Sequence, residues 1–184
     1  MENIPPQPKV NPSIVVFDLD ACCWSPDLYL MSGSPPFEYN KKTEVVTNSA
    51  NEKITLCPGV AETWNEIMTN PEFQKTSIAI ASRCWYYDWA IKLLNLYEVE
   101  PGKKMMDCCK YMEIYDRNKK NHFKSIKAKS GVEFEDMLFF DDMRDNINDA
   151  KSLGVVSVLC SDGFSRRKWK EGLMLFEKSK SKKN

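Results

Sequence analysis

Two pairs of aspartates stand where buried strands are expected to end. Asp18 and Asp20 follow the run SIVVF, and Asp141 and Asp142 follow MLFF. Residues two apart in a strand point to the same side, roughly 6 to 7 Å apart, so Asp18 and Asp20 converge. Like charges beside a buried sheet are unfavourable unless a cation or hydrogen-bond donors compensate them. Because Mg²⁺ prefers carboxylate oxygens, the two pairs predict a magnesium site; the alternative is that Asp18 and Asp20 are solvated loop acids.

Further residues at predicted strand and helix ends could hold a phosphate. Ser82 and Arg83 follow the run SIAIA, and a hydroxyl or backbone N–H at a helix start donates readily to phosphoryl oxygens. Lys119 begins a predicted helix, where its charge would neutralise the same phosphate, and Lys120 is the fallback. Taken alone, each has another reading: Ser82 as a helix N-cap, Arg83 and Lys119 as solvated surface residues.

The elements that must position these residues alternate between strands and helices. Short runs rich in Ile, Val and Phe predict strands over 13–20, 76–82, 108–115, 137–140 and 155–159. Helical periodicity predicts helices over about 60–70, 85–96, 119–129, 144–153 and 165–178, with Trp85 and Trp89 on the packed face of the second. This order predicts a three-layer, Rossmann-like α/β fold with a mostly parallel central sheet. Its carboxyl edge, where ligands bind, would carry the aspartates.

Residues 21–56 break the alternating pattern. Prolines and a glycine punctuate the segment, and about 35 residues is long for a bare loop, so we expect a small strand-containing flap beside the carboxyl edge. The segment is too short for an independent cap domain, which predicts an open site. The remaining sequence predicts a single domain over 1–184, with an N-terminal extension over 1–12 and a solvated basic tail over 179–184.

Composition excludes several classes of protein. The chain has 184 residues, 42% hydrophobic and 28% charged, which suits one folded domain. No apolar run approaches the roughly 20 residues that span a bilayer, and the N-terminus lacks a signal-peptide pattern, so we expect the cytosol or nucleus and no membrane partner. Seven cysteines without a CxxC pair, and one histidine, predict free thiols and no structural zinc. A zero net charge and a lone basic tail predict no nucleic-acid binding. Oligomeric state is not readable from the sequence.

The combination of motifs resembles the haloacid dehalogenase superfamily of phosphotransferases, and is most similar to the eukaryotic magnesium-dependent phosphatases. The resemblance covers about residues 13–176 and rests on FDLD, ASR at 81–83, HF at 122–123, SGVEF at 130–134, FFDD at 139–142 and LGV at 153–155. The superfamily's first motif is DxDxT or DxDxV, and this chain has Cys22 at its last position, which weakens any hydroxyl contact there.

The resemblance implies a role for each site residue. Asp18 is the nucleophile and a Mg²⁺ ligand, and Asp20 is the general acid and base that also binds the metal through its main-chain carbonyl. Asp142 is the further metal ligand, with Asp141 the close alternative. The phosphate is held by Ser82 and balanced by Lys119, while Arg83 contacts substrate. An outer-shell role stays open between Asp145 and Asn146.

These roles imply a Mg²⁺-dependent phosphomonoester hydrolase that works through an aspartyl phosphate. Its substrate would be a phosphate ester: a phosphosugar, a phosphotyrosyl protein or a small aryl phosphate. One alternative is a catalytically inactive phosphate-binding module on the same fold. Another is a receiver-like phosphoacceptor domain, although a receiver has its acidic pair on the first strand and a lone aspartate on the third.

Overall fold

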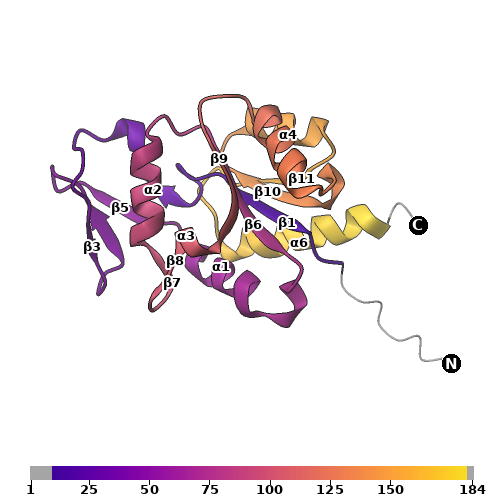
Figure 1. Ribbon diagram of the computed structural model, residues 1–184, viewed down its shortest axis with the longest axis horizontal. Coiled ribbons are helices and arrows are strands. Elements are labelled where there is room, and N and C mark those ends of the chain that lie inside the picture. The colour runs from indigo at the N-terminus through magenta and orange to yellow at the C-terminus, as the bar shows by residue number, and fades with distance from the viewer. Residues whose placement is uncertain (1–9, 182–184) are drawn as a thin grey trace.

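The computed structural model describes residues 10–181, so residues 1–9 of the predicted N-terminal extension and 182–184 of the basic tail lie outside the described part. A five-stranded sheet forms the centre of the molecule (Figure 1). All four neighbouring pairs are parallel, in the order β11-β10-β1-β6-β9. The strands are β1 (Ile14–Phe17), β6 (Ser77–Ser82), β9 (Cys109–Ile114), β10 (Met137–Asp141) and β11 (Val156–Leu159).

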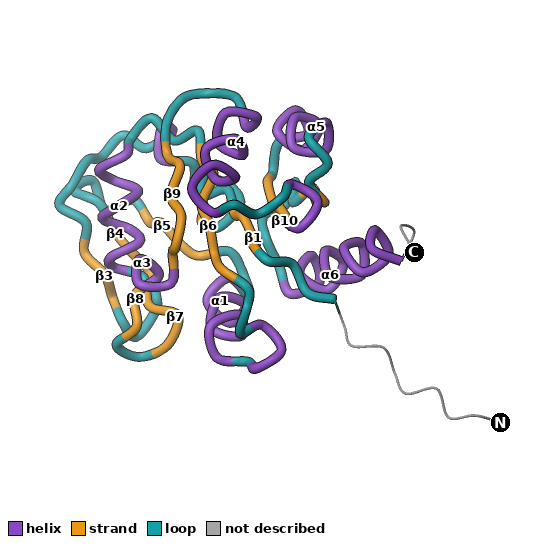
Figure 2. Tube along the Cα trace, turned by 45° about the vertical axis from the view of Figure 1, so that its right-hand side comes forward, coloured by secondary structure: helices purple, strands orange, loops and turns teal. Residues whose placement is uncertain are grey.

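Helices cover both faces of this sheet, as the alternating pattern predicted. Figure 2 shows α4 and α5 on one side of the strands, and α1 and α6 on the other. Within residues 10–181 the helices are α1 (Val60–Thr69), α2 (Tyr87–Leu96), α3 (Met105–Cys108), α4 (Lys119–Ser130), α5 (Arg144–Ser152) and α6 (Arg166–Ser181). Short 3-10 turns lie at Leu28–Leu30, Pro71–Phe73 and Phe134–Asp136.

The continuous apolar sequence of β1 follows from its central place. Ile14 and Val16 belong to the buried cluster under α4 and α5, whereas Val15 and Phe17 belong to the larger cluster on the opposite face. Alternate side chains of a strand point to opposite faces, so a strand covered on both sides must be apolar at every position. The three-layer α/β fold expected from the sequence is therefore confirmed.

The segment after β1 contains strands. β2 (Trp24–Ser25), β3 (Glu38–Asn40), β4 (Val45–Thr47) and β5 (Lys53–Leu56) form an antiparallel sheet in the order β2-β5-β4-β3. Its inner side chains Trp24, Val46 and Ile54 join the larger buried cluster of the main sheet, and the Tyr97 hydroxyl donates to the Ile54 carbonyl at 2.7 Å. A further hairpin, β7 (Glu98–Glu100) and β8 (Lys103–Lys104), was not predicted.

Three local expectations are wrong. The first strand ends at Phe17 rather than residue 20, because the chain turns there: the backbone N–H groups of Cys23 and Trp24 both donate to the Leu19 carbonyl. The second helix begins at Tyr87, and Trp85 precedes it with 75% of its surface exposed instead of packing.

The third correction concerns the tail. Helix α6 continues to Ser181, past the predicted end near residue 178, so residues 179–181 of the basic tail are helical. Lys180 anchors it through an ion pair with Asp136 at 2.5 Å. Within residues 10–181, no helix has the length and apolar character needed to cross a membrane.

Candidate active site

The candidate site lies where three neighbouring strands of the sheet end. Asp18 directly follows β1, Ser82 is the last residue of β6, and Asp141 is the last residue of β10. β1 lies between the other two strands, with Phe17 paired with Phe140 on one side and Ile80 on the other. Since the strands are parallel, their carboxyl ends meet at one edge. The backbone N–H of Asp18 donates to the Phe140 carbonyl at 3.0 Å, which extends this alignment to the aspartate.

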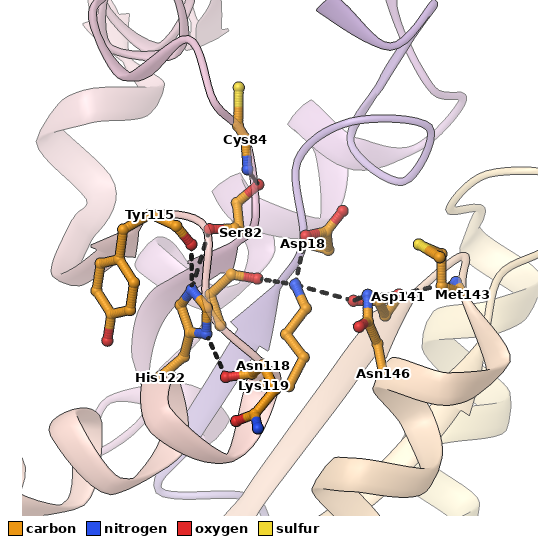
Figure 3. A network of polar contacts seen from close by, with 11 residues as sticks. Asp18, Ser82, Cys84, Tyr115, Asn118, Lys119, His122, Asp141, Met143 and Asn146 are labelled. Atoms are coloured by element: carbon orange, nitrogen blue, oxygen red, sulfur yellow. Dashed lines mark hydrogen bonds and ion pairs between the residues drawn. The ribbon is translucent and has the colours of Figure 1, made fainter. Parts of the chain in front are cut away.

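Lys119 joins these strand ends (Figure 3). Its side chain is fully buried, and its Nζ donates to Asp18 Oδ1 at 2.5 Å, to Asp141 Oδ2 at 3.0 Å and to the Ala81 carbonyl. An ammonium group has three N–H bonds, so these three acceptors match its donors. Lys120, the fallback, lies on the outer side of the helix, 3.6 Å from Asp149 Oδ1.

The start of α4 fixes where Lys119 lies. Asn118 is the N-cap, and its side-chain oxygen accepts from the backbone N–H of Asn121 at 3.2 Å. Lys119 is therefore the first helical residue, beside the end of β6. Phe123 and Ile126 pack the helix against the sheet, so the helix face that carries Lys119 is set by the same packing.

The two aspartates at the end of β10 differ in their surroundings. Asp141 accepts from the backbone N–H of Met143 at 2.8 Å and from Asn146 Nδ2 at 3.0 and 3.1 Å, besides its contact with Lys119. Its oxygens are thus already occupied by protein donors. Asp142 instead lines a cavity together with Asp18. Of the two residues left open for an outer-shell role, Asn146 holds Asp141 while Asp145 is exposed.

The cavity has a volume of about 330 Å³ and collects most of the expected site residues: Asp18, Asp20, Ser82, Arg83, Asp142 and Asn146. Sequence reasoning missed other lining residues of the cavity, among them Asp27, Tyr29, Trp85 and Tyr86. These residues come from the segment after β1 and from the loop before α2, and nothing in their own sequence singles them out. The only available signal was that both segments leave the carboxyl edge of the sheet.

Asp20 lies in the cavity apart from Lys119. Its Oδ1 accepts from Trp24 Nε1 at 2.7 Å, a contact four residues along the same turn. Burial raises the pKa of Asp20, and the hydrogen bonds from Trp24 and Cys84 only partly offset this effect. A raised pKa favours the protonated form of a carboxyl group, which is the form that can donate a proton.

Burial and crowding of carboxylates also shift the neighbouring groups. Burial raises the pKa of Asp18 well above its ordinary value, against the opposing charge of Lys119. Burial, with repulsion from Asp141, raises the pKa of Asp142 to about 6. For Lys119, burial lowers the pKa, but Asp18 and Asp141 outweigh it and the net pKa is raised. One lysine therefore faces several carboxylates, an arrangement that a cation would stabilise.

The donor set fits a hard divalent cation. No three acidic, histidine or cysteine side chains form a preassembled metal cage within residues 10–181. Mg²⁺ does not require one, because it keeps several waters and takes one or two carboxylates together with substrate phosphate. Asp18 and Asp142, which line the same cavity, are oxygen donors of this kind.

Ser82 and Arg83 border the cavity in different ways. Ser82 is buried, and its Oγ accepts from the backbone N–H of Cys84 at 3.3 Å. Arg83 is about half exposed and lies 3.3 Å from Asp116, which is equally exposed. Surface ion pairs of this kind contribute about 0 to 1 kcal/mol, so Arg83 is free to turn toward a ligand.

Cys22 is fully buried behind the aspartates. Its thiol hydrogen-bonds with that of Cys160, and its carbonyl accepts from the backbone N–H of Phe164 at 3.0 Å. The side chain thus packs inside the protein and supports the turn after Asp20 from behind.

A parallel sheet with two aspartates after its first strand, and a buried lysine that joins the first of them to Asp141 at the end of another strand, defines a hydrolase of the haloacid dehalogenase superfamily. Residues 10–179 match the sequence profile of the Acid Phosphatase family. The chain belongs to this family.

Individual relatives agree with that assignment. Magnesium-dependent phosphatase 1 of Homo sapiens is 30% identical over 172 residues, which cover 92% of this chain and 90% of that protein. A HAD-like hydrolase superfamily protein of Schizosaccharomyces pombe is 29% identical over 149 residues, 78% of this chain and 83% of that one. A solved HAD-superfamily hydrolase from Ehrlichia chaffeensis shares the fold, with a TM-score of 0.58, 11% identity, and coverage of 92% of this chain and 98% of that chain.

Proposed function

We propose that this chain is a Mg²⁺-dependent phosphomonoester hydrolase that works through an aspartyl phosphate on Asp18. The observation that carries the proposal is the contact of the buried Lys119 with both Asp18 and Asp141, next to a cavity that is lined by Asp18, Asp20, Ser82 and Asp142. A nucleophilic carboxylate, a separate acid and a positive charge are what phosphoryl transfer to an aspartate needs.

In the first half of the reaction, a carboxylate oxygen of Asp18 attacks phosphorus and the bond from phosphorus to the ester oxygen breaks. Asp20 donates its proton to that departing oxygen. In the second half, Asp20 takes a proton from water as the water oxygen attacks phosphorus, which releases inorganic phosphate and restores the Asp18 carboxylate. Lys119 holds Asp18 in place and balances charge, and Ser82 offers its hydroxyl to a phosphoryl oxygen.

Magnesium is supported by the donor set and by the human relative, which is named for its dependence on this metal. We assign Asp18, Asp142 and the main-chain carbonyl of Asp20 as its protein ligands. Asp142 is preferred to Asp141 because the Asp141 oxygens already accept from Lys119, Met143 and Asn146. Bound there, Mg²⁺ would neutralise charge on the phosphoryl oxygens.

The range of substrates follows from the aromatic residues that line the cavity. Tyr29, Trp85 and Tyr86 also line the cavity, and each of these residues is exposed. We therefore expect small aryl phosphates, phosphosugars and phosphotyrosyl peptides all to be accepted.

The compartment proposed is the cytosol or nucleus, which the seven unpaired cysteines support because thiols persist where the medium is reducing.

The test is hydrolysis of p-nitrophenyl phosphate in three conditions: with Mg²⁺, after EDTA, and after Mg²⁺ is restored. Activity should vanish in EDTA and return with Mg²⁺. Asp18→Asn should lower kcat at least about a thousandfold, because an amide cannot form the acyl phosphate. Asp145→Asn, a change at an exposed neighbouring acid, is the matched control and should retain activity.

Two results would contradict the proposal. Full activity in EDTA would show that the reaction does not require the metal. Near-normal activity of a folded Asp18→Asn protein would show that Asp18 is not the nucleophile. An inactive phosphate-binding module would instead bind inorganic phosphate in calorimetry without turning over any ester.

A further inference from the structure

We propose that His122 is a positioning residue for this reaction, holding the end of β6 and the start of α4 at a fixed distance so that Ser82 and Lys119 meet the same phosphate. The inference rests on the proposed function, because the residues that it positions are those that would bind the phosphate. His122 is the single histidine of the chain and its side chain is fully buried.

The imidazole ring is surrounded by backbone carbonyls (Figure 3). Its Nε2 lies 3.1 Å from the carbonyl oxygen of Ser82 and 3.0 Å from that of Tyr115. Its Nδ1 lies 3.0 Å from the carbonyl oxygen of Asn118, the N-cap of α4. One ring therefore contacts the end of β6, the chain that follows β9, and the residue immediately before Lys119.

Lys119 and His122 contact the backbone carbonyls of two successive residues of β6. They are three residues apart on α4, so they share one face of the helix. Lys119 donates to the carbonyl of Ala81, and His122 faces the carbonyl of Ser82, the next residue of β6. The helix thus holds two successive peptide groups of the strand that ends in Ser82, and loss of either side chain would loosen the placement of the Ser82 hydroxyl.

A histidine used only for packing would not need this polar environment. Each described partner of the two ring nitrogens is a carbonyl oxygen, and the ring also lies flat on Tyr115, with centroids 4.3 Å apart and planes 8° apart. Burial, together with the charge of Lys119, lowers the pKa of His122, so the neutral ring is favoured. In its Nε2–H form it donates to the carbonyl of Ser82, at the end of β6, and to that of Tyr115, just after β9, while Nδ1 then carries no hydrogen to donate to the Asn118 carbonyl. An apolar residue would fill the space without fixing either.

The test compares variants of His122 that keep or lose a donor, with kcat and KM for p-nitrophenyl phosphate measured beside the melting temperature. His122→Gln retains an N–H at the end of a side chain of similar reach, and kcat should stay within about fivefold of the wild type. His122→Leu has no donor, and kcat should fall roughly 10- to 100-fold with a smaller change in KM, as expected for a misplaced phosphoryl contact.

The control variant is Gly131→Ala, at the opposite end of the same helix. Gly131 is the C-cap of α4 and has a φ of +72°, where an alanine costs about 1 to 2 kcal/mol in stability, yet it lies nine residues from His122 and leaves each His122 contact in place. Its kcat should change less than about twofold. If His122→Leu does not fold, His122→Asn takes its place: its shorter amide cannot reach Ser82, so its kcat should be about tenfold below that of His122→Gln.

The proposal is overturned if His122→Leu folds and keeps the kcat of Gly131→Ala, since the histidine would then contribute stability alone. Equal activities of the Gln variant and of whichever donor-deficient variant folds would overturn it as well, because the N–H would not matter. If the wild type turns over no ester, the proposed function is wrong, and the positioning role with it. This result is distinguishable from the others because the wild type is measured before any variant.

Discussion

The two aspartates of the DLD motif lie in different surroundings. Asp18 is held by Lys119, whereas the contact of Asp20 is the indole N–H of Trp24. The charge of Lys119 opposes the rise in the pKa of Asp18 that burial causes, whereas the hydrogen bonds that oppose the rise in the pKa of Asp20 come from neutral groups. The chemistry proposed for each residue therefore follows from what it touches, not from its residue type.

This difference predicts how Asp20→Asn affects different substrates. An alkyl phosphate has a poor leaving group that needs a proton, so its turnover should fall about 10²- to 10⁴-fold, whereas p-nitrophenyl phosphate should lose less in the first half-reaction. Pre-steady-state kinetics of phosphoenzyme formation with both esters measures this. Equal losses of that rate for both would argue against an acid role.

The carboxylate of Asp142, a proposed metal ligand, is expected to destabilise the protein when no metal is bound. Its pKa is about 6 in the folded protein, above the ordinary value near 3.9 of an unfolded chain. Between these values the folded state binds more protons, so the free energy of unfolding of the metal-free protein decreases as pH rises through this range. Asp142→Asn removes the charge, and at pH 7 it should stabilise the metal-free protein by about 1 to 2 kcal/mol, a value reduced for partial exposure.

Urea unfolding in EDTA at pH 4 and pH 7 measures this effect. The variant should gain stability at pH 7 and little at pH 4, and it should bind Mg²⁺ more weakly in calorimetry. Asp145→Asn should show neither change. A variant that is no more stable than the wild type at pH 7 would show that Asp142 carries no such penalty.

At the scale of elements, α6 lies unusually close to the sheet. Gly172 faces Phe140, and a Cβ built on this glycine would lie only 2.6 Å from the Phe140 ring. Phe140 is fully buried and stacks on Phe17, with ring centroids 5.5 Å apart, so the ring has little room to move. The glycine thus lets the helix approach the strand that leads into Asp141.

Gly172→Ala should destabilise the protein. Alanine favours the helix by about 1 kcal/mol, but overpacking a rigid aromatic ring costs typically 1 to 3 kcal/mol, so we expect a net loss of about 1 kcal/mol. Thermal unfolding measures the difference. Met174→Ala, at a residue of the same helix that is 64% exposed, should be nearly neutral. An unchanged or raised melting temperature for Gly172→Ala would mean that α6 can shift away from β10 at no cost.

At the scale of the whole molecule, the small antiparallel sheet of β2 to β5 shares the core of the main sheet. Its inner residues belong to the cluster that contains Phe17 and Phe140, and Trp24 stacks on Tyr97 with centroids 6.5 Å apart. A unit without a core of its own is not expected to move as a separate cap domain. We therefore expect the cavity to remain open on the side of Trp85.

An open cavity predicts broad acceptance of substrates. Values of kcat/KM for p-nitrophenyl phosphate, a phosphosugar and a phosphotyrosyl peptide should lie within a few orders of magnitude of one another, since no lid must close over the leaving group. Steady-state kinetics with the three esters measures this. Turnover of a single small ester, with rejection of the larger ones, would show that the flap closes over the site.

The sequence by itself determined the layered fold and the edge where the site lies. Continuous apolar runs specify strands covered on both faces, and the helical period specifies the layers that cover them; both signals are local. The positions of Asp18, Ser82 and Asp141 directly after such runs were enough to place them at one carboxyl edge, because parallel strands all end on the same side.

Where two adjacent residues could fill one role in the site, only the tertiary structure decided between them. Lys119 and Lys120 are chemically identical, and the packing of α4 on the sheet decides which of them points inward. In the same way, the pairing of Asn146 with Asp141 leaves Asp142 to line the cavity. The contributions of Asp27 and Trp85 depend on how separate loops meet over the strand ends. Such contacts join residues far apart in the chain, and no local period of the sequence encodes them.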